Sequence, residues 1–166
     1  MPYIGQGSDG FGIRRRYFFT ASAGDTSLSG NDSNGLALKF TDGSLVDVYL
    51  NGVLLDGAVL HRCSVNGIQL DDVSCVGAVF SELNLSSCAI RRATFRQATL
   101  RNIQLTEAWL RHGDWTEATF DHCDLSDADL TDVKLSSAYL EGCSLTNTIL
   151  NGAKLQGARC EVNELL

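Results

Sequence analysis

ATLRN IQLTE AWLRH GDWTE ATFDH CDLSD ADLTD, residues 98–132, repeats one pattern every five residues. The third residue of each five is apolar. It falls on a position divisible by five, and every such position from 60 to 160 is apolar. Two positions earlier a second, usually smaller, residue recurs from Ala58 to Ala158, and Thr148 is its only polar member. This internal repeat decides the fold.

The spacing of these two residues sets the path of the chain. Residues two apart face the same side of a β-strand, but the next pair begins an odd number of positions later, so the chain must bend once per repeat to keep both pairs inward. Four equal bends close a square coil of about twenty residues and stack residue i on residue i+20. Steps of five would instead spread apolar residues around an α-helix. The sequence therefore predicts an all-β solenoid of about five coils with a dry interior.

The inward positions supply the predicted core and one packing detail. The largest core residues are expected to be Leu60, Phe80, Phe95, Leu100, Trp115, Phe120 and Leu140. Trp115 is the largest residue at a central position, and the small position beside it is Gly113, the only glycine in that register from 58 to 160. We interpret Gly113 as space vacated for the indole.

All six cysteines also fall on inward positions, which favours small apolar filler over metal ligands or disulfides. Cys123 and Cys143 are one coil apart, so a strand spacing of ~4.8 Å would allow a bridge between them. A reducing cytoplasm argues against one.

The units ATLRN (98–102), ADLTD (128–132) and AKLQG (153–157) resemble pentapeptide repeats. The resemblance implies a right-handed quadrilateral β-helix, which we assign to residues 58–166. It implies little about function, because the family includes DNA-mimicking gyrase binders and many members without a known activity.

Residues 1–57 follow a different pattern and are expected to form a small β module that precedes the solenoid. Four glycines in residues 1–12 are typical of a flexible arm. Short strands are expected near residues 15–21, 36–40 and 45–55, with a type I′ hairpin turn at Asn51-Gly52 inside the last of them.

This module is similar to the N-terminal segments of bacteriophage tail-fibre and other tail-associated proteins. The similar stretches are MPYIGQ (1–6), FTASAGDTSLSG (19–30) and LVDVYLNGVLLDG (45–57). The resemblance implies attachment to other virion proteins, and trimers are the favoured homo-oligomer by analogy with tail fibres. The candidate attachment residues are Tyr3, Ile4, Phe11, Arg14, Arg15 and Arg16.

The sequence shows neither a signal peptide nor an apolar run long enough to cross a membrane. We therefore expect synthesis in the bacterial host cytoplasm and a final location in the virion.

Residues with catalytic or metal-binding chemistry are few. His61, His112 and His122 fall just after central positions and should point outward, whereas the nearby cysteines point inward, so no shared metal ion is expected. No nucleophile elbow, P-loop or zinc-protease motif occurs. We expect a protein that is not an enzyme and needs no cofactor.

The charges suggest one partner surface. Five arginines lie in one coil, and the following coil holds seven acidic residues without a lysine or arginine. Stacking places Arg91 over Arg111, a like-charge pair that favours an anionic contact, and an outward Trp109 or Tyr139 could anchor a partner. The candidate partner surface is Arg91, Arg96, Trp109, Arg111 and Tyr139.

Two functions remain open. The first is a structural component of a bacteriophage virion, in which the β-helix is a rigid spacer, cap or binding surface. The second is a DNA mimic that binds gyrase, which the net charge of −7 favours. A mimic needs a long and consistently acidic rod, but about five coils span only ~25 Å and one coil is basic. Because mimicry also leaves residues 1–57 unexplained, we favour the virion component and expect no contact with nucleic acid.

Overall fold

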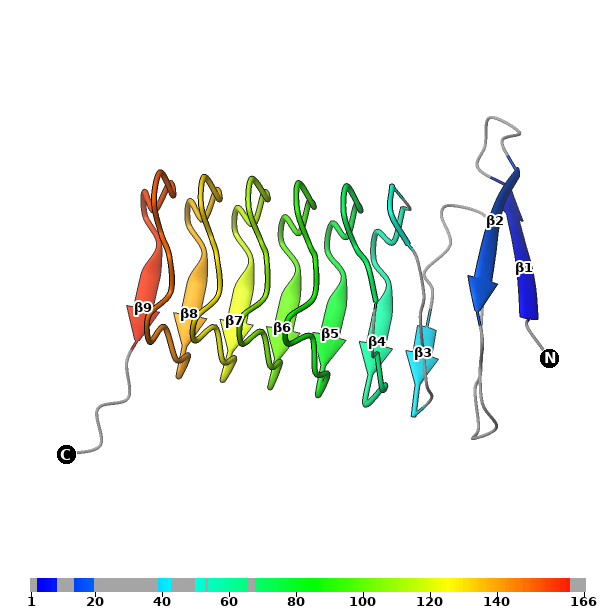
Figure 1. Cartoon of the computed structure of the whole chain (residues 1–166), viewed down its shortest axis with the longest axis horizontal. Coiled ribbons are helices and arrows are strands. Elements are labelled where there is room, and N and C mark those ends of the chain that lie inside the picture. The colour runs from blue at the N-terminus through cyan, green and yellow to red at the C-terminus, as the bar shows by residue number, and fades with distance from the viewer. Residues whose placement is uncertain are drawn as a thin grey trace.

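The computed structural model contains one long parallel sheet, whose seven strands follow one another in chain order (Figure 1). The structure describes residues 3–8, 14–19, 39–42, 50–52, 54–65 and 68–161. Of residues 3–8, 14–19 and 39–40 only the backbone is described. The sheet consists of β3 (Lys39–Thr41), β4 (Val59–His61), β5 (Val79–Ser81), β6 (Thr99–Arg101), β7 (Thr119–Asp121), β8 (Tyr139–Glu141) and β9 (Arg159–Glu161).

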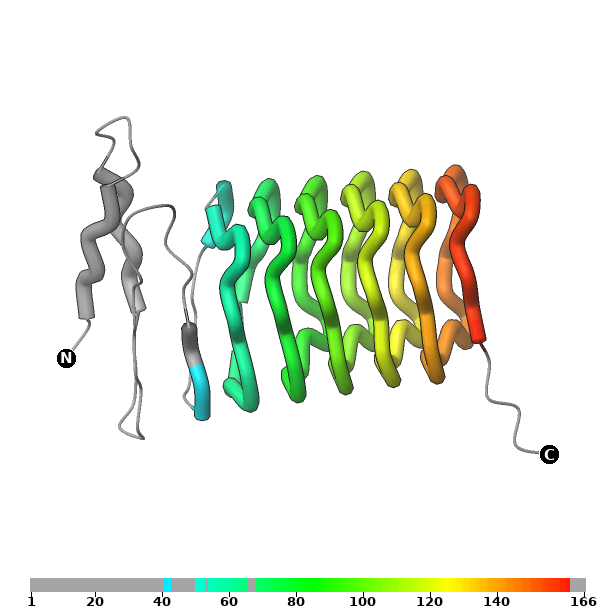
Figure 2. Tube along the Cα trace, turned by 180° about the vertical axis from the view of Figure 1, so that it is seen from behind, coloured from blue at the N-terminus to red at the C-terminus, as the bar shows by residue number. Residues whose placement is uncertain are grey.

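The register of this sheet is twenty residues throughout. Leu60 pairs with Phe80, and Leu100 pairs with Phe120. The other three sides of each coil are joined by shorter parallel bridges with the same offset, such as those from Asn84 to Gln104, from Ala89 to Trp109 and from Thr94 to Asp114. Viewed from behind, the coils lie side by side in a regular stack (Figure 2). The predicted fold class, an all-β quadrilateral β-helix, is confirmed.

Each corner of a coil is a tight turn. In the corner that follows Phe95, the Ala98 N–H donates to the Phe95 carbonyl at 3.1 Å. Gln97, the third residue of this turn, has a φ of 58° and donates its N–H to the carbonyl of Thr116 in the next coil at 3.0 Å. The same left-handed position recurs at other corners and mostly carries residues other than glycine. The bend required by the five-residue repeat is therefore made by one residue with positive φ per described corner, and this residue is strained wherever it is not glycine.

The inward residues form one continuous core. All seven residues expected to be its largest members are buried. Phe95 stacks on Trp115 with ring centroids 4.1 Å apart, and Trp115 lies against Phe120 at 5.4 Å. A side chain at Gly113 would collide with the Trp115 indole nitrogen. The glycine therefore provides the space that the indole occupies.

All six cysteines are free thiols. Burial raises the pKa of Cys75 and Cys88. A hydrogen bond with the Cys143 thiol, together with burial, raises the pKa of Cys123. Cys160 is exposed, in contrast to the inward environment expected for it, because no later described coil covers it.

The β-helical register begins before residue 58, where the sequence placed its start. Lys39 in β3 already pairs with Val59, and both Leu50 and Leu55 are buried in the core. Of residues 1–57, at least part therefore belongs to the solenoid.

The prediction of a type I′ hairpin turn at Asn51-Gly52 is wrong. Such a turn needs positive φ at both central residues, but only Gly52 has it, at 69°. The N–H groups of Leu50 and Gly52 instead donate to the backbone carbonyls of Gln69 and Asp71 in the next coil, at 3.0 and 2.9 Å. Pairing between coils overrides the local turn signal.

A second, two-stranded sheet lies near the N-terminus. The strands β1 (Tyr3–Ser8) and β2 (Arg14–Phe19) pair antiparallel, with Tyr3 opposite Phe19 and Ser8 opposite Arg14. Much of the arm expected to be flexible is therefore a strand. In the described part of the chain, no helix is long and apolar enough to cross a membrane.

Candidate functional site

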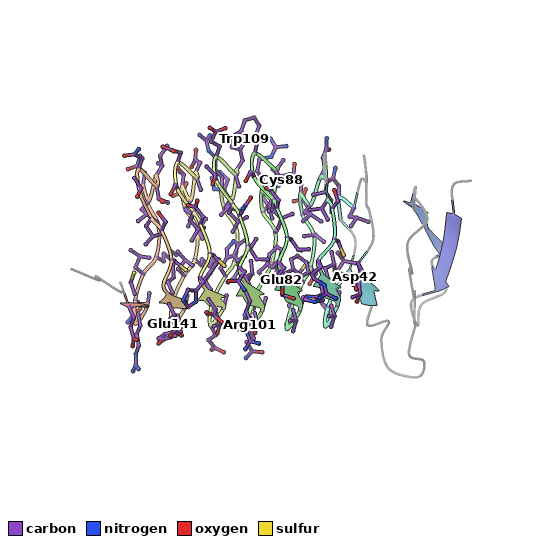
Figure 3. The ribbon with its side chains drawn as sticks, turned by 90° about the horizontal axis from the view of Figure 1, so that it is seen from below. Asp42, Glu82, Cys88, Arg101, Trp109 and Glu141 are labelled. Atoms are coloured by element: carbon purple, nitrogen blue, oxygen red, sulfur yellow. The ribbon has the colours of Figure 1, made fainter. Side chains whose placement is uncertain are left out.

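The candidate site lies on the side of the β-helix opposite the seven-stranded sheet. Trp109 lies ten residues, or half a coil, from the strand residues of β6 and β7. In Figure 3 it projects from the side opposite Arg101 and Glu141, which belong to β6 and β8. Trp109 directly precedes the buried Leu110 in the sequence, and Trp109 itself is 56% exposed. The alternation of a strand thus places an indole in solvent.

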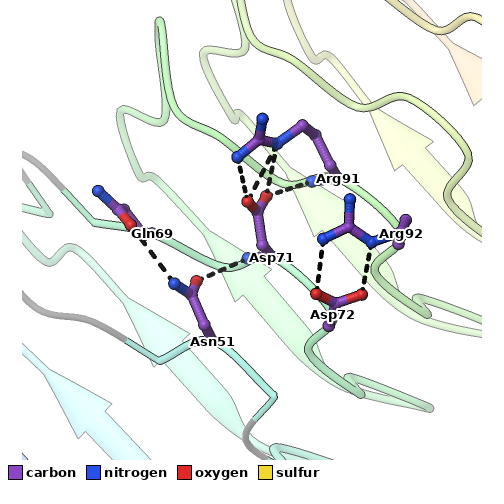
Figure 4. A network of polar contacts seen from close by, with 6 residues as sticks. All are labelled: Asn51, Gln69, Asp71, Asp72, Arg91 and Arg92. Atoms are coloured by element: carbon purple, nitrogen blue, oxygen red, sulfur yellow. Dashed lines mark hydrogen bonds and ion pairs between the residues drawn. The ribbon is translucent and has the colours of Figure 1, made fainter.

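Arg91 is held by an aspartate in the preceding coil. Its backbone N–H donates to Asp71 Oδ1 at 2.8 Å, its Nε donates to Asp71 Oδ2 at 3.0 Å, and its Nη2 also contacts that oxygen. Asp71 is buried, and its own N–H donates to Asn51 Oδ1 at 3.0 Å. Asn51, Asp71 and Arg91 therefore form a chain of contacts along one corner of three coils (Figure 4).

Arg111 lies one coil after Arg91, and it pairs with an aspartate in the following coil instead of the preceding one. Its Nε donates to Asp129 Oδ2 at 2.6 Å, and Asp129 lies in the following coil. Asp129 is also buried, and its Oδ1 accepts the Thr131 N–H at 3.0 Å. The like-charge stack expected from the sequence is relieved, because the two guanidinium groups pair with different acids in opposite directions along the solenoid.

These ion pairs keep both acids charged. Burial raises the pKa of the Asp71 carboxyl, but the hydrogen bonds and charge of Arg91 outweigh it and leave the pKa below its ordinary value. Burial also raises the pKa of the Asp129 carboxyl. Hydrogen bonds from Arg111 and Thr131 outweigh this effect and leave the pKa below its ordinary value. Both arginines have a raised pKa for the same reason. The surface therefore carries two matched pairs of charges, not two free cations.

Between the diverging arginines lies a shallow surface pocket. Its lining consists of Arg91, Trp109 and Arg111, and its volume is about 190 Å³. The structure thus brings together three of the five residues expected to form the partner surface. All three walls are planar groups, and none of them is a nucleophile or a general base at neutral pH. The pocket is suited to binding and not to covalent chemistry.

The other two residues lie elsewhere. Arg96 occupies the next corner of its coil, is exposed, and makes no ion pair with any described residue. Tyr139 belongs to β8, on the opposite side of the coil, and is only half-buried. Thus Arg96 and Tyr139 do not contribute to the pocket.

Five of the six candidate attachment residues lie in the N-terminal strands. Tyr3 and Ile4 belong to β1, and Arg14, Arg15 and Arg16 belong to β2. Phe11 falls outside the described residues. Pairing places Arg16 opposite Gln6 and Arg15 opposite Gly7.

The pairing of the two arginines with buried aspartates was not predicted from the sequence. Asp71 lies twenty residues before Arg91, so the same stacking rule that placed Arg91 over Arg111 could have found it. Asp129 lies eighteen residues after Arg111 and makes a diagonal contact, which an offset of twenty does not reveal.

The histidines take part in separate surface contacts. His61 Nδ1 lies 2.8 Å from Ser81 Oγ, and His112 Nδ1 lies 3.5 Å from Asp132 Oδ2. The hydrogen bond with Asp121 raises the pKa of His122. Among the described residues, no three His, Cys, Asp or Glu side chains gather in a way that could hold a metal ion.

Comparison with known proteins supports the repeat assignment. The family model described as pentapeptide repeats matches residues 98–136 and 123–159, with eight copies of the repeat. No curated protein matches the sequence.

Several solved structures are similar to the chain. HetL, a pentapeptide repeat protein involved in heterocyst differentiation regulation in the cyanobacterium Nostoc, is 24% identical over 75% of this chain, with a TM-score of 0.36. The chain spans 62% of the length of HetL. A pentapeptide repeat protein from the thylakoid lumen of Arabidopsis thaliana is 25% identical over 69% of this chain and 68% of its own, with a TM-score of 0.48.

The plasmid-mediated fluoroquinolone resistance protein QnrB1 is 17% identical over 75% of this chain and 83% of its own, with a TM-score of 0.43. None of these similarities assigns a partner or an activity to this chain. Together with the twenty-residue register, the family model establishes that the chain carries pentapeptide repeats across residues 98–159.

Proposed function

We propose that the chain is a non-enzymatic structural component of a bacteriophage virion, attached through its N-terminal segment and presenting the β-helix as a rigid spacer with a binding surface. The observation that supports this proposal is the pairing of the two N-terminal strands, which contain the candidate attachment segments. The hexapeptide MPYIGQ, which resembles the start of tail-associated proteins, contributes its last four residues to β1, and the basic cluster of residues 14–16 in β2 pairs with residues 8, 7 and 6 of that strand. The two candidate attachment segments thus form one unit.

The β-helix fits the role of a spacer. Many of its described backbone groups are paired from coil to coil, as in the hydrogen bonds from the Gln104 N–H to the Leu83 carbonyl and from the Asp124 N–H to the Ile103 carbonyl, at 3.0 and 2.9 Å. Repeats coupled in this way make a stiff rod whose length follows the number of coils.

The partners proposed here are other tail proteins and further copies of the chain. We favour a trimer, by analogy with tail fibres. Light scattering of the full-length protein at micromolar concentration should report a mass above that of one chain, and a monomer would remove this part of the proposal.

Gyrase binding by DNA mimicry is the second candidate, and the net charge of −7 favours it. Against it, cations from neighbouring coils match many of the acids along the rod, including Asp72 with Arg92 and Asp114 with Lys134. A supercoiling assay separates the two functions, because a mimic inhibits gyrase at stoichiometric concentration and a virion component does not.

The direct test is location. Mass spectrometry of purified particles should detect the chain at a fixed ratio to the major tail proteins, and cryo-electron microscopy should show its position. A lysate from which particles have been removed serves as the control. Presence of the chain only in that lysate would overturn the proposal.

A further inference from the structure

We propose that the pocket formed by Arg91, Trp109 and Arg111 binds an uncharged aromatic side chain, best a tyrosine, of a partner protein. The inference rests on the proposed binding role of the β-helix and specifies its chemistry. It is independent of residues 1–57, because all three lining residues belong to the described coils.

Size excludes most other occupants. Pockets that bind small molecules or cofactors usually measure about 300–1,000 Å³, whereas this one measures about 190 Å³. It is also open to solvent, since Trp109 is half exposed and both arginine side chains keep about half of their surface accessible. A single inserted side chain matches this volume, and contacts around the rim would supply the rest of the interface.

Charge favours an uncharged occupant. Both guanidinium groups are already matched by a carboxylate that is buried beside them. An additional anion would enter a site whose net charge is close to zero and would be repelled by Asp71 and Asp129. A neutral ring meets no such repulsion, and it gains the stacking that guanidinium and indole planes offer.

The free hydrogen-bond donors favour a hydroxyl on the ring. In each arginine, Nε and Nη2 hold the aspartate, so Nη1 has no partner among the described residues. A tyrosine hydroxyl can accept from such a donor while its ring stacks on the indole. Phenylalanine would fill the same space without satisfying the donor.

The pocket is also held in place before any partner binds. The carboxylates of Asp71 and Asp129 fix the two guanidinium groups, and the hydrogen bond from the Arg91 backbone N–H to Asp71 Oδ1 fixes the corner beneath Arg91. A preformed pocket costs little ordering free energy on binding. Tryptophan and arginine are also the residue types that most often dominate the energy of protein interfaces.

The experiment uses nuclear magnetic resonance of the full-length chain, which has two tryptophans. Trp115 is buried and Trp109 is exposed, so their indole N–H signals report the core and the pocket separately. The probe is N-acetyl-tyrosinamide at millimolar concentration, and N-acetyl-alaninamide, sodium acetate and sodium phosphate are the comparisons. We expect the tyrosine probe alone to cause a saturable shift of the Trp109 signal while the Trp115 signal stays in place.

The matched variants are Arg91→Ala and Arg92→Ala. Arg92 is the neighbouring residue and holds Asp72 through the same two nitrogens, at 2.7 Å each, but it does not line the pocket. Arg91→Ala should lose most of the tyrosine-induced shift, and Arg92→Ala should keep it. An unchanged Trp115 signal verifies that each variant has folded.

Two results would overturn the inference. Equal shifts with acetate or phosphate would mean that the pocket is an anion site, and no saturable shift with the tyrosine probe would mean that it does not take an aromatic side chain. Neither result bears on the virion proposal, which is tested by locating the chain in particles.

Discussion

At the scale of single residues, the interior of the β-helix tolerates little change in volume. The indole nitrogen of Trp115 is buried without a hydrogen-bond partner in the described structure, so the site accepts an unpaired donor in exchange for the aromatic stack with Phe95. An unpaired buried donor costs about 1–3 kcal/mol. Packing therefore outweighs hydrogen bonding at this position.

The first prediction concerns Gly113. Replacement by leucine should destabilise the fold by roughly 1–3 kcal/mol, because even the first side-chain carbon would collide with the Trp115 nitrogen and lie 3.0 Å from its Cδ1. Backbone strain does not contribute, since Gly113 is not among the residues with positive φ. Ala118→Val, at an equivalent buried position, is the control and should cost less. Equal midpoints of the two variants in thermal melts would remove the packing explanation.

The second prediction concerns the pH dependence contributed by Asp71. Its pKa is lowered in the folded protein, so its stabilising effect is fully present above the unfolded pKa of about 3.9 and is lost as the pH falls through the folded pKa. Asp71→Asn should cost about 1 kcal/mol at neutral pH, and this difference should shrink in acid.

Asp72→Asn is the matched control for this prediction. Asp72 pairs with Nε and Nη2 of Arg92, the same two nitrogens through which Arg91 holds Asp71, but half of the Asp72 side chain is exposed, so its loss should be nearly neutral. Thermal melts from pH 7 down to pH 3 measure both variants. A difference between wild type and Asp71→Asn that stays constant over this range would show that the carboxylate charge is not involved.

At the scale of the structural element, the corner turn limits what the repeat can accept. The left-handed residue of each turn is strained when it carries a side chain, and cross-coil hydrogen bonds offset the strain. Ser87 illustrates this, since its φ is 57° and its N–H donates to the Thr106 carbonyl at 2.9 Å.

The third prediction follows from this strain. Ser87→Gly should raise the free energy of unfolding by up to about 1 kcal/mol, because glycine adopts positive φ without steric cost. Ser86→Gly, one residue earlier and without positive φ, should lower it by ~0.5–1 kcal/mol. Chemical denaturation measures both. A loss of stability in both variants would show that the corner strain is negligible.

The sequence predicted this element well where its signal was periodic. The paired inward positions and the twenty-residue stack follow from spacing alone, as Leu60 beneath Phe80 illustrates. It failed where a local signal competed with the periodic one, since Asn51-Gly52 favours a hairpin in isolation but lies in a corner whose partners are in the next coil. The pocket was only partly predictable, because the direction of each arginine depends on Asp71 and Asp129.

At the scale of the whole molecule, the contacts fall into two groups. Among the described strands, each of β3 to β9 contacts its sequential neighbours, and β1 and β2 contact only each other. Stability of the β-helix is therefore close to a sum of terms between adjacent coils. It follows that the N-terminal sheet can be removed at little cost to the fold.

The central claim is that the two parts of the chain have separate roles, with attachment at the N-terminus and rigid presentation by the coils. Deletion of residues 1–19 removes the whole of β1 and β2 and tests this claim most directly. We predict that the shortened protein keeps the β-rich circular dichroism spectrum and the melting midpoint of the full chain but is absent from purified particles. If the shortened protein were found in particles at the copy number of the full chain, attachment would have to be assigned to the β-helix.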